Sequence, residues 1–135
     1  MSVKKTTSSR PPQAPRLRLS DHAKIVLRGR YLAKNDTGRI IEAPAQLLWR
    51  VATDIAQAER LYPQASRLPQ AAQRWYDCMA RRDFLPNSPT LMNAGRRLQQ
   101  LSACFVLPVE DSLVSIYDSL KHQALIHQSG GGTGF

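Results

Sequence analysis

The spacing of apolar residues along the chain predicts three helices between residues 20 and 84. The first begins at the N-cap pair Ser20-Asp21 and runs to about Leu32. The second begins near Pro44, because proline suits the first turn of a helix. Its predicted buried stripe lies at positions i, i+3, i+4 and i+7, with Trp49 beside it: Leu48, Val51, Ala52 and Ile55. The third opens at Pro69, ends near residue 82 and carries one apolar face: Ala72, Trp75, Tyr76 and Met79.

The pattern changes after residue 84. Residues 86–90 contain two prolines and predict a loop, and residues 93–95 predict a turn. The apolar run 101–107 predicts a short buried strand, followed by a fourth helix that is capped at Asp111-Ser112 and ends near Gln128. A single buried strand leaves its backbone groups without ladder partners. We therefore expect residues 20–84 to form a helical domain and residues 85–135 to form the start of a truncated α/β domain.

The net charge of +9 is concentrated at the N-terminus. Residues 1–34 hold nine Lys and Arg against one acid, whereas residues 35–135 hold ten against nine. Residues 1–19 therefore predict a disordered basic leader. A basic tail can also bind phosphates, so a small basic nucleotide- or nucleic-acid-binding protein is an alternative interpretation, and a non-functional remnant is another.

Targeting and redox signals are sparse. No apolar run approaches the ~18 residues that a membrane helix needs, and the N-terminus lacks the apolar core of a signal peptide. The two cysteines, Cys78 and Cys104, are too few for a disulfide framework. These features predict a cytoplasmic protein with free thiols and no membrane association.

Candidate chemistry lies in the second half of the chain. Cys104, in the predicted strand, is either an inert core cysteine or a redox thiol. Ser88 offers a hydroxyl on a rigid turn that can bind a phosphate or a ribose hydroxyl. The glycines of residues 130–134 match neither common phosphate-loop pattern, yet they let backbone N–H groups approach a ligand closely. His122 and His127 do not share a helix face, so we predict no metal site.

Three longer runs, at residues 84–95, 101–112 and 129–135, occur in an order and spacing that point to one family. Together they closely resemble the N-terminal part of the large chain of adenosylcobalamin-dependent (class II) ribonucleotide reductases, over about residues 18–135. The resemblance implies a helical domain followed by a ten-stranded α/β barrel. It also implies thiyl-radical reduction of ribonucleotides to deoxyribonucleotides, with adenosylcobalamin as cofactor.

The resemblance also assigns roles to individual positions. Cys104 matches one member of the cysteine pair that reduces the substrate, which favours the redox interpretation over the inert one. The positions that match substrate-binding residues are Ser88, at the phosphates, together with Ala103, Cys104, Gly131 and Gly132. The positions that match the deoxynucleotide effector site are Asp111, Ser112 and Leu113.

Several family elements have no counterpart in this sequence. The Asn-Leu-Cys-x-Glu segment, the second cysteine of the reducing pair and the C-terminal cysteine shuttle are absent, and most of the cobalamin-binding face belongs to the missing region. We therefore expect the chain alone to be inactive. The implied partners are the remaining barrel in trans and a thioredoxin-like dithiol; nucleic acid is not an expected partner.

Overall fold

The computed structural model describes residues 17–63 and 67–135. The predicted leader, residues 1–19, therefore lies almost entirely outside the described residues. In chain order the elements are α1 (Asp21–Val26), the π-helix η1 (Leu27–Tyr31), α2 (Pro44–Ala56), the 3₁₀-helix η2 (Gln57–Leu61), α3 (Leu68–Arg81), α4 (Ser88–Asn93), β1 (Cys104–Val106), α5 (Leu113–Gln128) and β2 (Gly132–Gly134).

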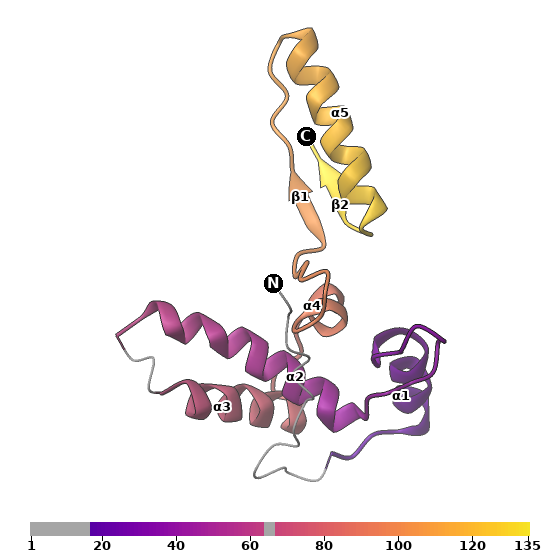
Figure 1. Ribbon diagram of the computed structural model, residues 1–135, viewed down its shortest axis with the longest axis vertical. Helices are drawn as coiled ribbons and strands as arrows, with labels where there is room; N and C mark the ends of the chain where they lie inside the picture. Colours follow the sequence, from indigo (N-terminus) through magenta and orange to yellow (C-terminus); the bar gives the residue numbers. More distant parts are fainter. Residues whose placement is uncertain (1–16, 64–66) are drawn as a thin grey trace.

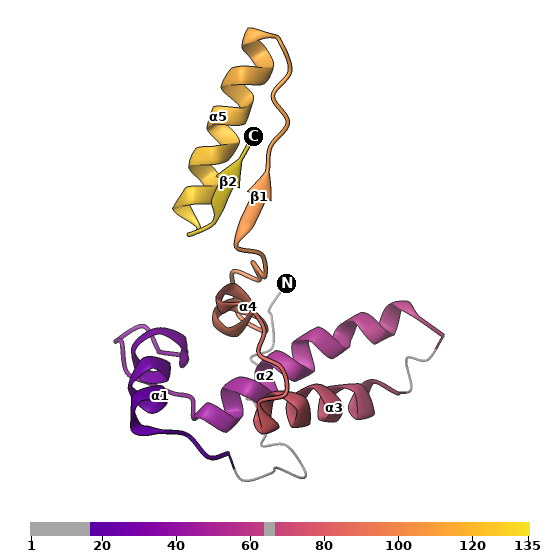
Figure 2. The ribbon, with the colours of Figure 1, turned by 180° about the vertical axis from the view of Figure 1, so that it is seen from behind.

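The molecule has two parts joined through α4 (Figure 1). Helices α1, α2 and α3 lie together at one end, and β1, α5 and β2 lie together at the other. The view from behind gives the same arrangement, with α2 beside α3 and α5 beside β2 (Figure 2). This mainly helical body leading into a short α/β unit agrees with the predicted fold class.

The helix starts follow the sequence signals. The Ser20 hydroxyl oxygen accepts a hydrogen bond from the Ala23 N–H at 3.2 Å, which caps α1. Before α2, the Ala43 N–H donates to the Gln46 side chain at 2.8 Å, and Pro44 occupies the first turn. The first helix differs in one respect: beyond Val26 it continues as a π-helix, with the Leu32 N–H donating to the Leu27 carbonyl at 2.9 Å.

The core lies between α2 and α3. Most of the two predicted stripes is buried there: Leu48, Val51 and Ala52 from α2, and Ala72, Tyr76 and Met79 from α3. The Trp49 and Tyr76 rings pack edge to face with their centroids 5.8 Å apart. Trp75 lies on the same predicted face of α3 but is 42% exposed, and its ring lies against Phe84 at the surface. Leu47, which we did not single out, is fully buried.

The structure also corrects the loop predicted at residues 86–90, because residues 88–90 begin the helix α4. Asn87 caps the short helix α4, because its side-chain oxygen accepts a hydrogen bond from the Thr90 N–H at 3.1 Å. Pro89 lies in the first turn of α4, where a proline costs no helical hydrogen bond. The prolines therefore delimit a helix start here. The turn predicted at residues 93–95 is present, with Gly95 at φ +68°.

The predicted buried strand is shorter and more exposed than expected. β1 has three residues, and Val106 is 82% exposed. Part of the expected glycine loop is the strand β2, which pairs with β1 in parallel in the register Cys104–Gly132, Phe105–Thr133 and Val106–Gly134. The backbone of β1 thus has a partner within the chain. The α5 residues predicted on one face are all exposed: Leu113, Ile116, Tyr117 and Leu120.

Candidate functional site

Side chains of α4 hold the backbone that leads into β1. The Leu101 carbonyl accepts hydrogen bonds from the Asn87 amide and the Thr90 hydroxyl, both at 3.1 Å. One residue earlier, the Gln100 carbonyl accepts a bond from the Asn93 amide at 2.8 Å. The element that carries Ser88 is therefore tied to the segment that carries Ala103 and Cys104.

The parallel pairing brings four predicted site residues together. The Gly132 N–H donates to the Ala103 carbonyl at 2.7 Å, and Cys104 lies beside Gly132 in the register. Neighbouring residues at the same register position of paired strands share one face of a sheet. Cys104 and Gly132 therefore lie on the same face of the two strands, and Gly131 directly precedes Gly132 in the chain.

The opposite face of the two strands packs against α5. Phe105 and Thr133 occupy that face, and the Thr133 hydroxyl lies 3.1 Å from Nε2 of His127 on α5. Exposure alternates along β1, with Phe105 half-buried between the exposed Cys104 and Val106. Within the described part of the chain, the face with the Cys104 thiol is the uncovered one.

The glycines near β2 differ in their surroundings. A Cβ on Gly131 would lie 2.7 Å from Cγ2 of Ile126 and 2.9 Å from Cε2 of Phe105, so close packing requires glycine there. A Cβ on Gly132 would meet only the Ala103 carbonyl at 3.7 Å, and one on Gly134 would meet nothing within 4 Å. The absence of side chains at these two positions therefore leaves open space beside Cys104.

The two thiols lie in different parts of the molecule. Cys104 is exposed on β1, whereas Cys78 is half-buried on α3, and both are free. Within the described residues, Cys104 is not buried in a core. Its thiol is accessible to a reaction partner.

Ser88 is exposed in the first turn of α4 and has a partner that sequence reasoning missed. The Tyr31 hydroxyl on η1 lies 2.8 Å from the Ser88 hydroxyl oxygen. The two residues are 57 positions apart, so no local pattern links them. Their proximity arises only from the packing of η1 on α4.

The predicted effector residues lie at the opposite end of α5 from the glycines (Figure 1). Ser112 caps α5 by accepting a hydrogen bond from the Ser115 N–H at 3.1 Å, while Asp111 and Leu113 are exposed. The 16 residues of α5 span about 24 Å at 1.5 Å per residue. These residues therefore do not converge with Cys104. A cavity of about 390 Å³ lies beside them, with Glu110, Ser112 and His122 in its lining.

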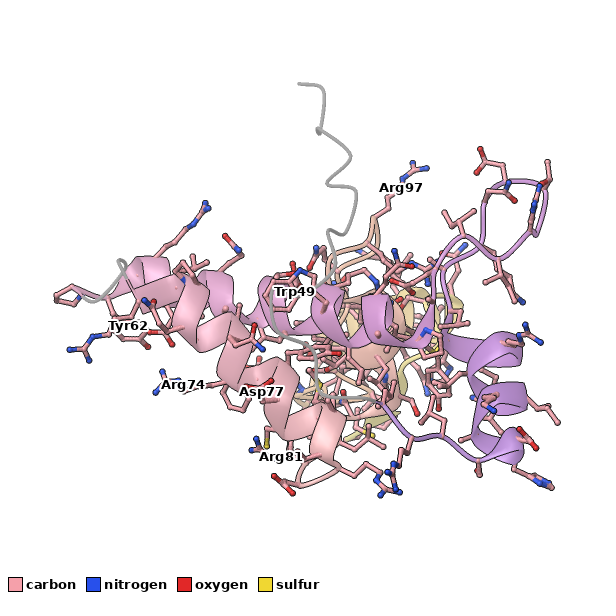
Figure 3. All side chains as sticks on the ribbon, turned by 90° about the horizontal axis from the view of Figure 1, so that it is seen from below. Trp49, Tyr62, Arg74, Asp77, Arg81 and Arg97 are labelled. Carbon is pink, nitrogen blue, oxygen red and sulfur yellow. The ribbon has the colours of Figure 1, made fainter. Side chains whose placement is uncertain are left out.

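Several arginines of the helical part are exposed. Arg74 and Arg81 extend outward from α3, and Arg97 points away from the helices (Figure 3). A hydrogen bond to Asp83 raises the pKa of Arg81. Burial, and secondly the positive charge of Arg50, lowers the pKa of Arg96.

Among residues 17–63 and 67–135, no group of three or more His, Cys, Asp or Glu side chains is placed to hold a metal ion. Within the same residues, no helix combines the length and apolar character that crossing a membrane requires.

Two family models match the chain in sequence order. A model described as the ribonucleotide reductase all-alpha domain matches residues 17–99, and one described as the ribonucleotide reductase barrel domain matches residues 102–135. Together they cover nearly all of the described residues. The change from helical body to β1–α5–β2 unit falls where the second match begins.

Curated relatives carry matching names. A vitamin B12-dependent ribonucleoside-diphosphate reductase of Mycobacterium tuberculosis is 47% identical over 120 residues, which cover 88% of this chain and 17% of that protein. Its counterpart in Thermoplasma acidophilum is 38% identical over 173 residues, 88% of this chain and 22% of that protein. A ribonucleoside-diphosphate reductase large subunit of Danio rerio is 39% identical over 105 residues, 77% of this chain and 12% of that protein. The chain thus spans about a fifth of the length of the first two relatives.

Proposed function

The chain belongs to the ribonucleotide reductase family, and on that premise we propose that it supplies part of the substrate site of a ribonucleotide-reducing enzyme. In this proposal Ser88 binds the substrate phosphates, and Ala103, Cys104, Gly131 and Gly132 line the nucleotide. The product is a deoxyribonucleotide for DNA synthesis.

One observation carries the proposal: the exposed Cys104 thiol lies beside Gly132 on the uncovered face of the two strands. Open space next to a thiol lets a substrate approach the sulfur directly. The close packing behind the glycines, where Phe105 and Ile126 meet Gly131, holds the backbone of that face in place. A rigid face of β1 and β2 with one reactive thiol can hold a substrate in a fixed position relative to the sulfur.

The chemistry needs a second thiol. Reducing a ribonucleotide breaks the C2′–O bond, forms a C2′–H bond and releases water, while two thiols lose two hydrogens and become a disulfide. Cys104 supplies one thiol. Cys78 is a poor second thiol because it lies half-buried on α3, in the other part of the molecule (Figure 1). We therefore propose that a further segment, acting in trans, supplies the other thiol and the radical, and that a thioredoxin-like dithiol reduces the disulfide.

Adenosylcobalamin is the proposed cofactor of the complete enzyme, since two relatives are named vitamin B12-dependent. The described residues do not fit this group by themselves. The cavities beside α1 and α5 have volumes of about 430 and 390 Å³, well below the ~1,000 Å³ of the largest common ligand pockets. We assign no cobalamin contact to this chain.

Further features of the proposal rest on the family. Asp111, Ser112 and Leu113 contribute to a deoxynucleotide effector site, and the cavity of about 390 Å³ beside them offers room for a ligand. The division into a leader at 1–19, a helical domain at 20–84 and a barrel start at 85–135 is also proposed. Bonds from α4 to the backbone at Gln100 and Leu101 tie α4 to the segment that leads into β1, while Leu91 and Ala94 of the same region pack in the helical core. A cytoplasmic location agrees with the two free thiols.

The alternative of a small basic binding protein has no support in the comparisons. That alternative depends on the basic leader, most of which (residues 1–16) lies outside the described residues.

A hybrid enzyme tests the proposal. This chain replaces the matching N-terminal segment of the Mycobacterium tuberculosis relative, and deoxyribonucleotide formation is measured with adenosylcobalamin and a dithiol. We expect turnover by the hybrid, no turnover by the 135-residue chain alone, and loss of at least a hundredfold in the hybrid with Cys104→Ser, since serine cannot form the disulfide. Cys78→Ser is the matched control and leaves turnover unchanged.

Two results would count against the proposal. Undiminished turnover by the Cys104→Ser hybrid would remove the redox role of Cys104. Turnover by the isolated chain would remove the need for a segment in trans.

A further inference from the structure

A single hydrogen bond joins the π-helix η1 to the first turn of α4. The hydroxyl oxygens of Tyr31 and Ser88 lie 2.8 Å apart. The Tyr31 ring is half-buried against the helical core, while its hydroxyl reaches the exposed Ser88. The phenol therefore links the rigid interior to a surface hydroxyl.

The elements on both sides of this bond are fixed by the same buried ion pair. Two residues after Tyr31, the Ala33 N–H donates to the Glu42 carboxylate at 3.0 Å. Glu42 pairs with Arg50, and Arg50 in turn donates to the Leu91 carbonyl of α4 at 3.2 Å. Because the Glu42–Arg50 pair bonds both to the backbone just after η1 and to α4, the positions of Tyr31 and Ser88 relative to each other are fixed.

The local backbone around Tyr31 is also unusual. η1 is a π-helix, and short π-helical segments occur often at functional sites. The π-helical segment ends at Tyr31, the residue that contacts Ser88. This observation comes from the backbone and is independent of the hydrogen bond.

We propose that Tyr31 is a positioning residue for Ser88 in the binding of a ribonucleoside diphosphate, an inference that rests on the proposed function. Tyr31 donates its hydroxyl hydrogen to the Ser88 oxygen. The Ser88 hydrogen is then directed outward, to an oxygen of the substrate phosphate.

The chemistry of the two hydroxyls sets this direction. Each hydroxyl has one hydrogen to donate, and a phosphate oxygen only accepts. The Ser88 hydroxyl can donate its hydrogen to the phosphate only if it does not donate it to Tyr31. Tyr31 must therefore be the donor between the two hydroxyls in the bound state. Successive hydrogen bonds that end at an anion strengthen one another. Tyr31 thus acts through Ser88 and does not itself touch the nucleotide.

The experiment titrates the full 135-residue chain, labelled with ¹⁵N and ¹³C, with cytidine 5′-diphosphate and follows the amide signals of residues 87–90 by NMR. We expect Ser88→Ala to weaken binding about tenfold, because a bond to a charged group is lost. We expect Tyr31→Phe, which keeps the ring, to weaken it about fivefold. The double variant should bind like Ser88→Ala alone, because Tyr31 acts through Ser88. Tyr117→Phe, on the exposed face of α5, is the matched control and should bind like the unsubstituted chain.

A second measurement does not depend on any variant of Tyr31. The ring signals of Tyr31 should shift during the titration of the unsubstituted chain and stay still in Ser88→Ala. A merely structural role for Tyr31 would predict losses that add in the double variant.

The outcomes separate the two proposals. If Ser88→Ala weakens binding while Tyr31→Phe does not, or if the losses add, the inference about Tyr31 is overturned and the substrate role of Ser88 stands. The inference about Tyr31 is also overturned if the ring signals of Tyr31 do not shift when the ligand is added to the unsubstituted chain. If the unsubstituted chain shows no shift at residues 87–90, the substrate role of Ser88 and the role of Tyr31 fall together.

Discussion

Glu42 and Arg50 form a buried ion pair that joins three segments of the helical part. Nε of Arg50 donates to one carboxylate oxygen of Glu42 at 2.8 Å, and Nη2 donates to the other at 3.1 Å. The guanidinium also donates to the carbonyls of Leu91 and Ala94, at the end of α4. Gly95 lies against Arg50, and a Cβ there would be 2.9 Å from Cγ of the arginine. The pair therefore determines where α4 sits on α2.

The first prediction concerns this pair. Glu42→Gln leaves the Arg50 charge buried without its counter-ion, so the free energy of unfolding should fall by about 3 kcal/mol. Urea unfolding followed by circular dichroism measures the loss. Asp21→Asn is the control, because the Asp21–Lys24 pair is exposed and its loss should cost about 0.5 kcal/mol or less. Equal losses of unfolding free energy in the two variants would show that the buried pair stabilises the fold no more than the exposed pair does.

The second prediction separates two adjacent glycines. Gly131→Ala forces a methyl group against Phe105 and Ile126 and should destabilise the β1–α5–β2 unit by about 2 kcal/mol. Gly132→Ala meets only open space and the Ala103 carbonyl at 3.7 Å, so its stability should be unchanged. Hydrogen exchange of the amides of residues 132 and 107, which pair the strands, measures the difference. Similar exchange in both variants would contradict the packing argument.

The third prediction compares two neighbours on α5. Ser119 is buried, and its hydroxyl donates to the Pro108 carbonyl at 2.8 Å, so Ser119→Ala should cost about 1 kcal/mol. Leu120 is 55% exposed, and Leu120→Ala should change the unfolding free energy by no more than about 0.5 kcal/mol. Thermal unfolding of the two variants side by side tests the order. A larger loss for Leu120→Ala would mean that α5 has an apolar contact that the described residues do not contain.

The fourth prediction concerns the reactivity of the thiols. Cys104 is exposed and Cys78 half-buried, so iodoacetamide should modify Cys104 several times faster because access limits the reaction. Mass spectrometry of tryptic peptides at successive times measures both rates in one sample. In Cys104→Ser the fast phase should vanish, and in Cys78→Ser it should persist. Faster labelling of Cys78 would contradict the accessibility on which the proposed function relies.

Local signals predicted the helical part well. Ser20, Pro44 and Ser112 each begin a helix at the expected place, because capping and the fixed φ of proline act within a few residues. The apolar stripe of α2 is buried as its spacing indicated, apart from Ile55, which is half-buried. The family resemblance was confirmed by the two matching models.

The differences from the sequence-based expectations have local and long-range causes. Residues 88–90 of the predicted loop begin the helix α4, because the Asn87 side chain caps it and Pro89 fits its first turn. The strand at Cys104 is paired because residues 132–134 return beside it after the whole of α5. Trp75 is 42% exposed, and its ring packs at the surface against Phe84, beyond the end of α3. The roles of the site residues stay predictions until they are tested.

The sequence by itself determined helices α1, α2, α3 and α5, because propensity, capping and apolar period act over a few residues, and its motifs indicated the family. It also indicated the residue types of the site: a serine, a cysteine and a run of glycines. Only the tertiary structure decided that Cys104 lies beside Gly132 with open space around the thiol, and that Tyr31 reaches Ser88. Such contacts join residues 28 to 57 positions apart, and their geometry depends on how whole helices and strands pack.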